Sequence, residues 1–243
     1  MGILVSCECG KTFKVPEKFA GKKGKCAGCG KILDIPVPVG HGEADEPVIG
    51  YIGSFVEYEG VDDLVEAAGA LAAQGRRFRL LLVGDGLSLP GVRAKIEVAG
   101  LRDRTVLTGR VPHEDIARYY SLVDICPFPR KPWEVCELVS PLKPFEAMAQ
   151  EKAVVVSRTA ALEEIVVGGE TGVVFDAGNI PALVRALAML FDDADLRRRL
   201  GGAARRWILS NRTWRSAGKA CIAVYGRLEA GAHRHNDASP QPN

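Results

Sequence analysis

The sequence predicts an α/β fold in which a doubly wound parallel sheet follows a small cysteine-bearing segment. Three observations lead to this prediction. From residue 48 onward, apolar runs of strand length alternate with amphipathic helical stretches, as in a parallel sheet covered by helices on both faces. Two closely spaced pairs of cysteines stand within the first 35 residues. Between these parts, residues 36–47 are rich in proline, glycine and acidic side chains without periodicity, as in a linker.

Composition and charge exclude several classes of protein. The chain has 243 residues, of which 47% are hydrophobic, so it can bury a sizeable core. Its net charge of +2 gives no overall attraction to nucleic acid or to a membrane surface. The residues after Met1 form no signal peptide, and no apolar run approaches the roughly 20 residues that cross a bilayer. We therefore expect a cytoplasmic protein without a membrane span.

The four cysteines of the first segment are spaced like zinc ligands. Cys7 and Cys9 form one pair, and Cys26 and Cys29 form the other after a hairpin rich in lysine and glycine. Four thiolates in two such pairs can surround zinc at about 2.3 Å, and the metal supplies folding energy that a small core cannot. We predict that residues 1–35 are a zinc ribbon with a structural metal, since four protein ligands leave no position for a catalytic water. The alternative is that these thiols bind no metal.

Lysines make the same segment locally basic. We interpret them as a solvated face and not as a nucleic-acid-binding surface, because only Phe13 and Phe19 offer aromatic surfaces for stacking. Nucleic acid is therefore not expected among the partners.

The elements of the α/β domain, residues 48–228, follow from their apolar runs and helical periods. Strands are expected, in chain order, at residues 48–53, 79–84, 105–107, 123–128, 153–157 and 172–175. Helices are expected at residues 61–74, 181–191, 195–209 and 214–228, and a further helix carries Glu146. Residues 229–243 are polar and contain proline, which predicts a disordered tail. Ligands of such a sheet bind outside the carboxyl ends of its strands.

The turn before the helix that carries Glu146 has the features of a phosphate site. Residues 138–142 supply backbone amides beside a helix N-terminus, and both stabilise the phosphates of a nucleoside diphosphate. Gly53 lets the loop after the first strand approach these phosphates closely. A carboxylate in the first turns of the helix can accept hydrogen bonds from both hydroxyls of a ribose. The cations available for the diphosphate are Arg130, Lys131 and Lys143.

Six segments occur in the order in which a known family has them. They are residues 51–60, 82–86, 107–111, 136–149, 160–166 and 169–175. Together they resemble the C-terminal, donor-binding half of the family 4 retaining glycosyltransferases, over nearly the whole α/β domain. The resemblance implies a Rossmann-like sheet that forms a single half of the GT-B architecture. It also implies transfer of a hexose, with retention of configuration, from a nucleoside diphosphate sugar to an unknown acceptor.

The resemblance also implies roles for individual residues. Glu146 would contact the ribose and Arg110 with Val111 would frame the base, whereas the alternative for Glu146 is an exposed helix carboxylate. The residues expected at catalytic positions are Glu137, Lys143 and Glu146. The residues expected to bind the donor are Gly53, Ser54, Arg110, Val111, Arg130, Leu138, Val139 and Ser140.

The sequence departs from the family pattern in the donor motif and in the first loop. The family separates its two motif glutamates by seven residues, and counting back from Glu146 gives Leu138, with Glu137 one residue earlier. Ser54 and Glu59 stand where the first loop of the family carries an arginine and a lysine. We expect Lys143 to replace the lost positive charge.

The single α/β domain leaves three hypotheses about function, because GT-B enzymes combine two Rossmann-like domains. The first is a glycosyltransferase, or the donor-binding half of a split one whose partner is a separate acceptor-domain protein. The second is a non-catalytic module that binds a nucleotide sugar or docks a partner. The third is a truncated product without function.

Overall fold

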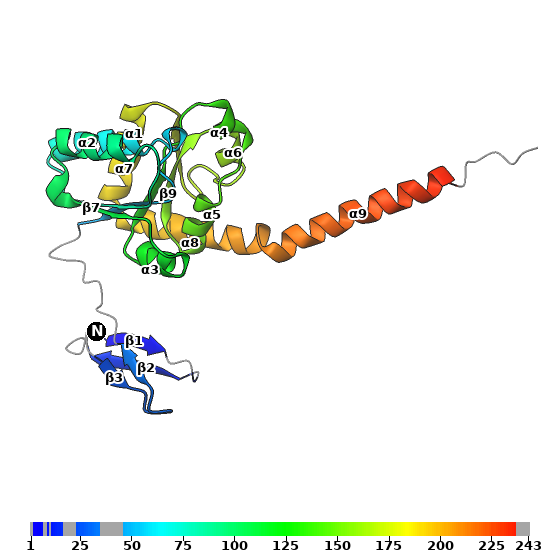
Figure 1. Ribbon diagram of the computed structural model, residues 1–243, viewed down its shortest axis with the longest axis horizontal. Helices are drawn as coiled ribbons and strands as arrows, with labels where there is room; N and C mark the ends of the chain where they lie inside the picture. The colour runs from blue at the N-terminus through cyan, green and yellow to red at the C-terminus, as the bar shows by residue number, and fades with distance from the viewer. Residues whose placement is uncertain (1, 7–8, 10, 17–22, 35–45, 237–243) are drawn as a thin grey trace, which may run out of the picture. The chain divides into compact units, whose positions relative to one another are not determined.

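The computed structural model describes residues 2–6, 9, 11–16, 23–34 and 46–236 (Figure 1). The chain divides into two compact units, Met1–Glu46 and Pro47–Asn243. The first unit contains two antiparallel strand pairs, β1 (Gly2–Ser6) with β2 (Thr12–Pro16) and β3 (Lys23–Lys25) with β4 (Ile32–Asp34). Residues 36–45 of the predicted linker lie outside the described residues.

The second unit is an α/β fold around a six-stranded parallel sheet, which confirms the predicted fold class. All six strands coincide with apolar runs of the sequence, since central strands covered on both faces need apolar residues at consecutive positions. The strands are β5 (Val48–Ile52), β6 (Arg79–Val83), β7 (Thr105–Gly109), β8 (Ile125–Phe128), β9 (Ala153–Arg158) and β10 (Val173–Asp176).

Helices cover both faces of this sheet. On one face α1 (Val61–Ala73) packs against α2 (Leu89–Val98) and α7 (Ile180–Asp192), and on the other α5 (Lys143–Ala149) packs against α8 (Ala194–Asn211) (Figure 1). The other described helices are α3 (Ile116–Ser121), α4 (Glu134–Leu138), α6 (Ala160–Glu163) and α9 (Trp214–Asn236). Single 3-10 turns are formed by Glu57–Glu59 (η2), Arg102–Arg104 (η3) and His113–Asp115 (η4).

The strand order places β5 at the point where the chain reverses the direction in which it adds strands to the sheet. The order is β10-β9-β8-β5-β6-β7, so the chain first builds outward from β5 and then returns to add β8 on its other side. Loops that leave the carboxyl ends of strands on the two sides of such a point diverge, and the crevice between them is the usual ligand site of this architecture.

Two glycines let the loops after β5, β6 and β8 approach one another closely. Gly84 has φ 140°, and a Cβ atom there would lie 1.8 Å from the carbonyl oxygen of Gly53. Gly60 has φ 68°, and a Cβ atom there would lie 1.9 Å from the carbonyl oxygen of Pro129. Only glycine combines these backbone conformations with such close contacts. The crevice is therefore bounded by loops in direct backbone contact.

The C-terminal helix extends beyond its predicted end. α9 continues to Asn236, so the structure gives residues 229–236 as helix, where the sequence predicted the start of a disordered tail. The helix can continue because no proline occurs between Trp214 and Pro240, and because Glu229 and Ala230 are good helix formers. Residues 237–243 lie outside the described residues. Among the described helices, none is both long and apolar enough to cross a membrane.

We predict that Gly84→Ala lowers the free energy of unfolding by about 1–3 kcal/mol, because alanine disfavours the positive φ and its methyl group would collide with the Gly53 backbone. Gly91→Ala is the matched control, since Gly91 lies in α2 with open space around it. That change should leave stability unchanged or raise it by up to about 1 kcal/mol. Urea unfolding measures both, and equal effects of the two substitutions would contradict the loop contact.

Candidate functional site

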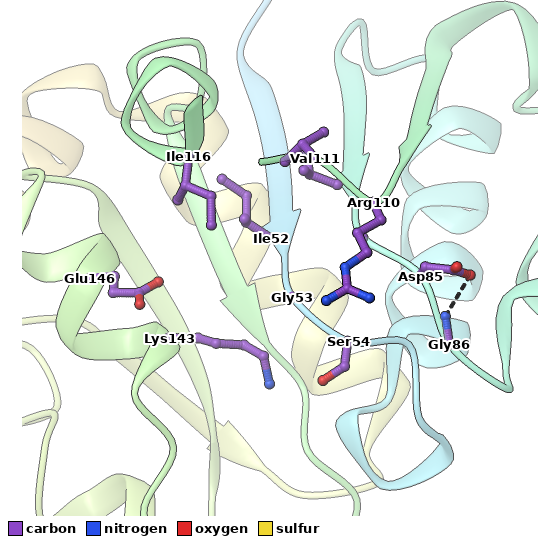
Figure 2. Close-up of a pocket in the computed structure, with 12 residues that line it drawn as sticks. Ile52, Gly53, Ser54, Asp85, Gly86, Arg110, Val111, Ile116, Lys143 and Glu146 are labelled. Atoms are coloured by element: carbon purple, nitrogen blue, oxygen red, sulfur yellow. Dashed lines mark hydrogen bonds between the residues drawn. The ribbon is translucent and has the colours of Figure 1, made fainter. Parts of the chain in front are cut away.

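A pocket of about 540 Å³ lies at the carboxyl ends of β5, β6 and β7 and beside the start of α5 (Figure 2). This volume lies within the range of pockets that hold small-molecule ligands. The loops after β5 and β7 and the first turn of α5 supply most of its polar groups. The predicted site residues that line it are Gly53, Ser54, Arg110, Val111, Lys143 and Glu146.

Lys143 crosses the loop that follows β5 and contains Gly53, here called the glycine loop, at the edge of this pocket. Its side chain passes so close to Gly53 that a Cβ atom there would lie 2.2 Å from the Lys143 Cε. Its ammonium donates a hydrogen bond to the Glu59 carboxylate at 2.7 Å. The absence of a side chain at Gly53 therefore makes room for Lys143, in addition to any ligand.

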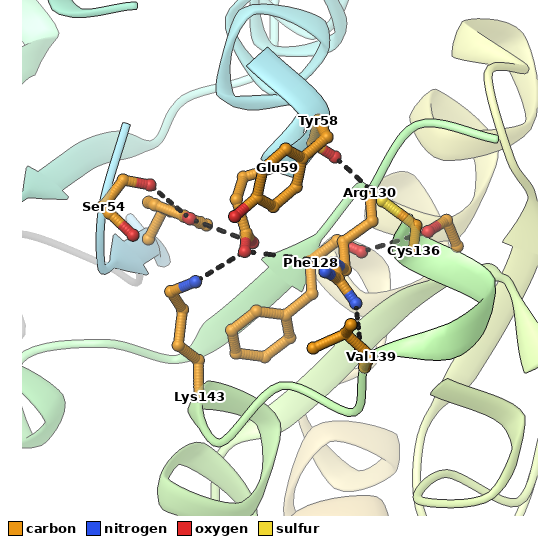
Figure 3. A network of polar contacts seen from close by, with 10 residues as sticks. Ser54, Tyr58, Glu59, Phe128, Arg130, Cys136, Val139 and Lys143 are labelled. Carbon is orange, nitrogen blue, oxygen red and sulfur yellow. Dashed lines mark hydrogen bonds and ion pairs between the residues drawn. The ribbon is translucent and has the colours of Figure 1, made fainter. Parts of the chain in front are cut away.

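The carboxylate of Glu59 is the centre of a buried polar network that also contains Tyr51, Arg130 and Lys143, here called the Glu59 network. Figure 3 shows Arg130 and Lys143 on either side of Glu59. Glu59 is 3% exposed and accepts hydrogen bonds from the Tyr51 hydroxyl at 3.2 Å and from Lys143. The Arg130 Nε lies 3.9 Å from the same carboxylate. Burial and the negative charge of Glu59 raise the pKa of Tyr51 well above its ordinary value, so its hydroxyl stays protonated.

Arg130 is placed in the core and not at the pocket. Its side chain is 3% exposed and does not line the pocket, although the sequence predicted it as a cation for the donor. Its guanidinium donates to the Val139 carbonyl at 2.8 Å and lies 5.6 Å from the centre of the Tyr58 ring. Arg130 thus joins the turn before α5 to Glu59.

Four other predicted site residues also lie outside the pocket lining. The Glu137 carboxylate accepts a hydrogen bond from the Ala160 amide at 2.6 Å, at the first residue of α6. Leu138, Val139 and Ser140 are exposed. Of the three positions expected to be catalytic, the pocket therefore brings together Lys143 and Glu146 and leaves out Glu137.

The Glu146 carboxylate is in contact with a buried tyrosine, Tyr120. The hydroxyl of Tyr120 lies 3.4 Å from the Glu146 carboxylate, within hydrogen-bond distance. Burial is the main reason why the pKa of Tyr120 is raised above its ordinary value, so the hydroxyl donates this bond. The carboxylate of Glu146 consequently has a fixed orientation at the wall of the pocket.

The loop after β6 supplies a wall that the sequence analysis did not assign. Gly84, Asp85 and Gly86 line the pocket, and the Asp85 carboxylate accepts a hydrogen bond from the Gly86 amide at 2.7 Å. The sequence contained a signal for this wall, because Gly84 and Gly86 stand at the end of the strand predicted at residues 79–84. This strand is the next one along the chain after the strand predicted at residues 48–53. Such a position marks a ligand-facing loop in a doubly wound sheet.

In the first unit, three of the predicted zinc ligands lie together. The sulfur atoms of Cys9, Cys26 and Cys29 are within 4.8 Å of one another, and those of Cys9 and Cys26 are 3.6 Å apart. Sulfur ligands at about 2.3 Å from a tetrahedral ion are separated by about 3.8 Å. The Gly28 amide donates a hydrogen bond to the Cys26 sulfur at 3.3 Å. These residues fit a zinc ion, while Cys7 lies outside the described residues.

Two curated proteins and one solved structure illustrate what the chain is similar to. It is 28% identical over 188 residues to the alpha-D-kanosaminyltransferase of Streptomyces kanamyceticus, covering 77% of this chain and 47% of that protein. It is 28% identical over 193 residues to the GDP-mannose-dependent alpha-(1-6)-phosphatidylinositol monomannoside mannosyltransferase of Mycolicibacterium smegmatis, covering 78% and 50%. Sucrose-phosphate synthase of Thermosynechococcus elongatus matches with a TM-score of 0.67 at 27% identity, covering 78% and 47%. The chain spans about half the length of these relatives.

The fold and the position of the pocket define a Rossmann-like domain of the kind that forms one half of a GT-B protein. Residues 39–207 match the family described as glycosyl transferases group 1, and the chain belongs to this family. The glycosyltransferase resemblance of the sequence is thereby confirmed at the level of the family.

Proposed function

We propose that the chain is the donor-binding part of a retaining family 4 glycosyltransferase, which moves a hexose from a nucleoside diphosphate sugar to an acceptor. The observation that carries this proposal is the pocket in which Lys143, Glu146 and Arg110 surround the glycine loop (Figure 2). Lys143 offers positive charge to a diphosphate, and Arg110 with Val111 would frame the base. Glu146 offers a carboxylate to the hydroxyls of a ribose.

The proposed chemistry makes leaving-group stabilisation the main task of these residues. The bond between the anomeric carbon and the diphosphate oxygen breaks, the acceptor hydroxyl oxygen bonds to that carbon from the same face of the sugar, and the hydroxyl proton passes to the departing diphosphate oxygen. Negative charge then develops on the nucleoside diphosphate, and cations fixed beside it lower the barrier. Lys143 suits this role because its ammonium is held by Glu59 while its side chain borders the pocket.

The name of one relative supports the class of donor. That relative is described as GDP-mannose-dependent, and the name of the other identifies it as a sugar transferase. We propose that this chain also uses a nucleoside diphosphate sugar as donor, and we leave the base and the sugar open. A thermal-shift panel of nucleotide sugars identifies the base and the hexose, since a ligand at a hundred times its Kd adds about 2.7 kcal/mol to the free energy of unfolding.

We further propose that a separate acceptor domain completes the site. The relatives are about twice as long as the matched region, so their remaining half has no counterpart in it. Exposed apolar side chains on α9 offer one surface to such a partner, since exposed apolar groups can form interaction sites. These side chains are Trp214, Ile222, Tyr225 and Leu228, with exposed fractions of 64–90%.

We also propose that the first unit is a zinc ribbon with one structural zinc ion. The support is the grouping of Cys9, Cys26 and Cys29, with Cys7 as the fourth ligand expected from the sequence. The zinc would hold the two strand pairs of this unit together, and with four sulfur ligands it would take no part in sugar transfer.

Glu146→Ala should weaken binding of nucleoside diphosphates by about 1.5–3 kcal/mol, because it removes a charge-assisted hydrogen bond to the ribose. Calorimetry with uridine and guanosine diphosphates measures this effect. Glu134→Ala is the control, since Glu134 is an exposed carboxylate at the start of α4 outside the pocket. Unchanged affinity in Glu146→Ala would mean that Glu146 is only an exposed helix carboxylate and would move the ribose site elsewhere.

The purified chain alone should bind a donor sugar nucleotide and transfer the sugar slowly or not at all. Its described residues form one Rossmann-like domain, whereas the GT-B architecture uses a second one to exclude water and to orient an acceptor. Adding the matching acceptor domain should raise the transfer rate. Product formation from labelled donor measures it. Efficient transfer by the isolated chain would contradict the need for a partner, and donor binding with no transfer under either condition would favour the non-catalytic module.

Metal analysis of the purified chain should give about one equivalent of zinc, as expected for one four-ligand site. Cys26→Ser and Cys29→Ser should each lose most of the metal. Cys221→Ser should keep it, because Cys221 is an exposed cysteine of α9 outside the cysteine group. Less than about half an equivalent in the unmodified chain, with no further loss in the Cys26 and Cys29 variants, would contradict a zinc ribbon.

A further inference from the structure

Glu59 is a buried carboxylate to which the proposed reaction gives no direct role. It ends the short turn η2 between β5 and α1, and its side chain is 5% exposed. It is not among the residues that line the pocket. A carboxylate in such a place is tolerated only when opposite charges and hydrogen-bond donors surround it. Its position therefore depends on its partners, and theirs depends on it.

The charges of the Glu59 network are not balanced. Glu59 is its one carboxylate, Arg130 and Lys143 are cations, and Tyr51 remains neutral because its pKa is raised. The network thus holds an excess of one positive charge. Arg130 is enclosed and bonded to the Val139 carbonyl, whereas Lys143 lies at the pocket wall with a side chain that is 19% exposed. The excess charge can meet a ligand only through Lys143.

The geometry fixes where that charge is presented. Lys143 is a long, flexible side chain, and in the structure it lies across Gly53 with its ammonium 2.7 Å from Glu59 (Figure 3). Without the carboxylate, Lys143 would be repelled by Arg130 and would be free to swing into solvent. The carboxylate also neutralises Arg130, which has almost no access to water.

We propose that Glu59 is a positioning residue that holds the ammonium of Lys143 against the glycine loop, where it meets the diphosphate of the donor. This inference rests on the proposed function for the identity of the ligand. Glu59 acts through Lys143 and touches no reacting atom. The opposite arrangement, in which Glu59 competes with the ligand for Lys143, predicts an effect of the opposite sign when the carboxylate is removed.

The first experiment compares two substitutions that remove the same charge from the same turn. Glu59→Gln should weaken binding of uridine or guanosine diphosphate at least tenfold, which corresponds to about 1.4 kcal/mol. Glu57→Gln is the control, because Glu57 lies in η2 with an exposed side chain and should change affinity by less than about twofold. Stronger binding in Glu59→Gln would overturn the proposal, since it would make Glu59 a competitor of the ligand.

A double-mutant cycle separates positioning from a general effect on the fold. In a Lys143→Met background, Glu59→Gln should change the affinity for the diphosphate by less than about twofold, because the side chain through which Glu59 acts is gone. An undiminished loss in that background would overturn the proposal. If Glu59→Gln does not fold, Glu59→Asp keeps the charge beside Arg130 but shortens its reach to Lys143. It should also weaken binding, and unchanged or stronger binding would refute positioning.

A measurement without ligand distinguishes failure of this inference from failure of the proposed function. The rate at which an amine-acylating reagent modifies Lys143, followed by peptide mass mapping, reports whether its ammonium is held. Glu59→Gln should raise this rate at least threefold relative to the chain without substitutions, and Glu57→Gln should not. An unmodified chain that binds no nucleoside diphosphate would refute the proposed function alone, whereas an unchanged acylation rate in Glu59→Gln would refute the positioning role.

Discussion

The carboxylate of Glu59 ties together three segments that lie far apart in the sequence. Tyr51 reaches it from β5, Arg130 from the end of β8 and Lys143 from the start of α5. Because a buried carboxylate needs opposite charges and donors around it, these partners cannot move independently of one another. The place of the Lys143 ammonium beside the glycine loop, at one wall of the pocket, is tied to this one buried charge.

Backbone contacts bring the loops within reach of that carboxylate. β5 lies where the sheet changes direction, so loops from both halves of the sheet meet at its carboxyl end. Gly84 packs on the backbone of Gly53, and Lys143 packs on the other side of the same residue. A side chain at Gly53 would displace the lysine that carries the positive charge. The glycine and the ion pair are therefore parts of one arrangement, in which close packing determines where a charge can be presented.

The fold could be predicted in more detail than the site, for a physical reason. A strand that is buried on both faces of the sheet can be recognised from consecutive apolar residues in the sequence. A glycine loop or the start of a helix can likewise be recognised from neighbouring residues. The roles of Arg130 and Glu137 are not local, because they depend on a carbonyl at Val139 and an amide at Ala160 that only tertiary packing brings near. A sequence identifies a cation but not whether it faces the pocket or the core. For Glu59, the sequence revealed an unusual residue, and its burial followed only from the structure.

The two unusual positions of the sequence are complementary in the structure. Where the resemblance implies a lysine in the first loop, Glu59 stands instead, and Lys143 on α5 is a cation that the structure places beside this loop. A lysine at position 59 would put three cations together with no carboxylate among them, and Lys143 could not then remain across Gly53. With glutamate there, the first loop supplies the anion and α5 supplies the cation, so the glycine loop still has a positive charge beside it. The two positions are therefore directly paired, since the Lys143 ammonium donates a hydrogen bond to the Glu59 carboxylate at 2.7 Å.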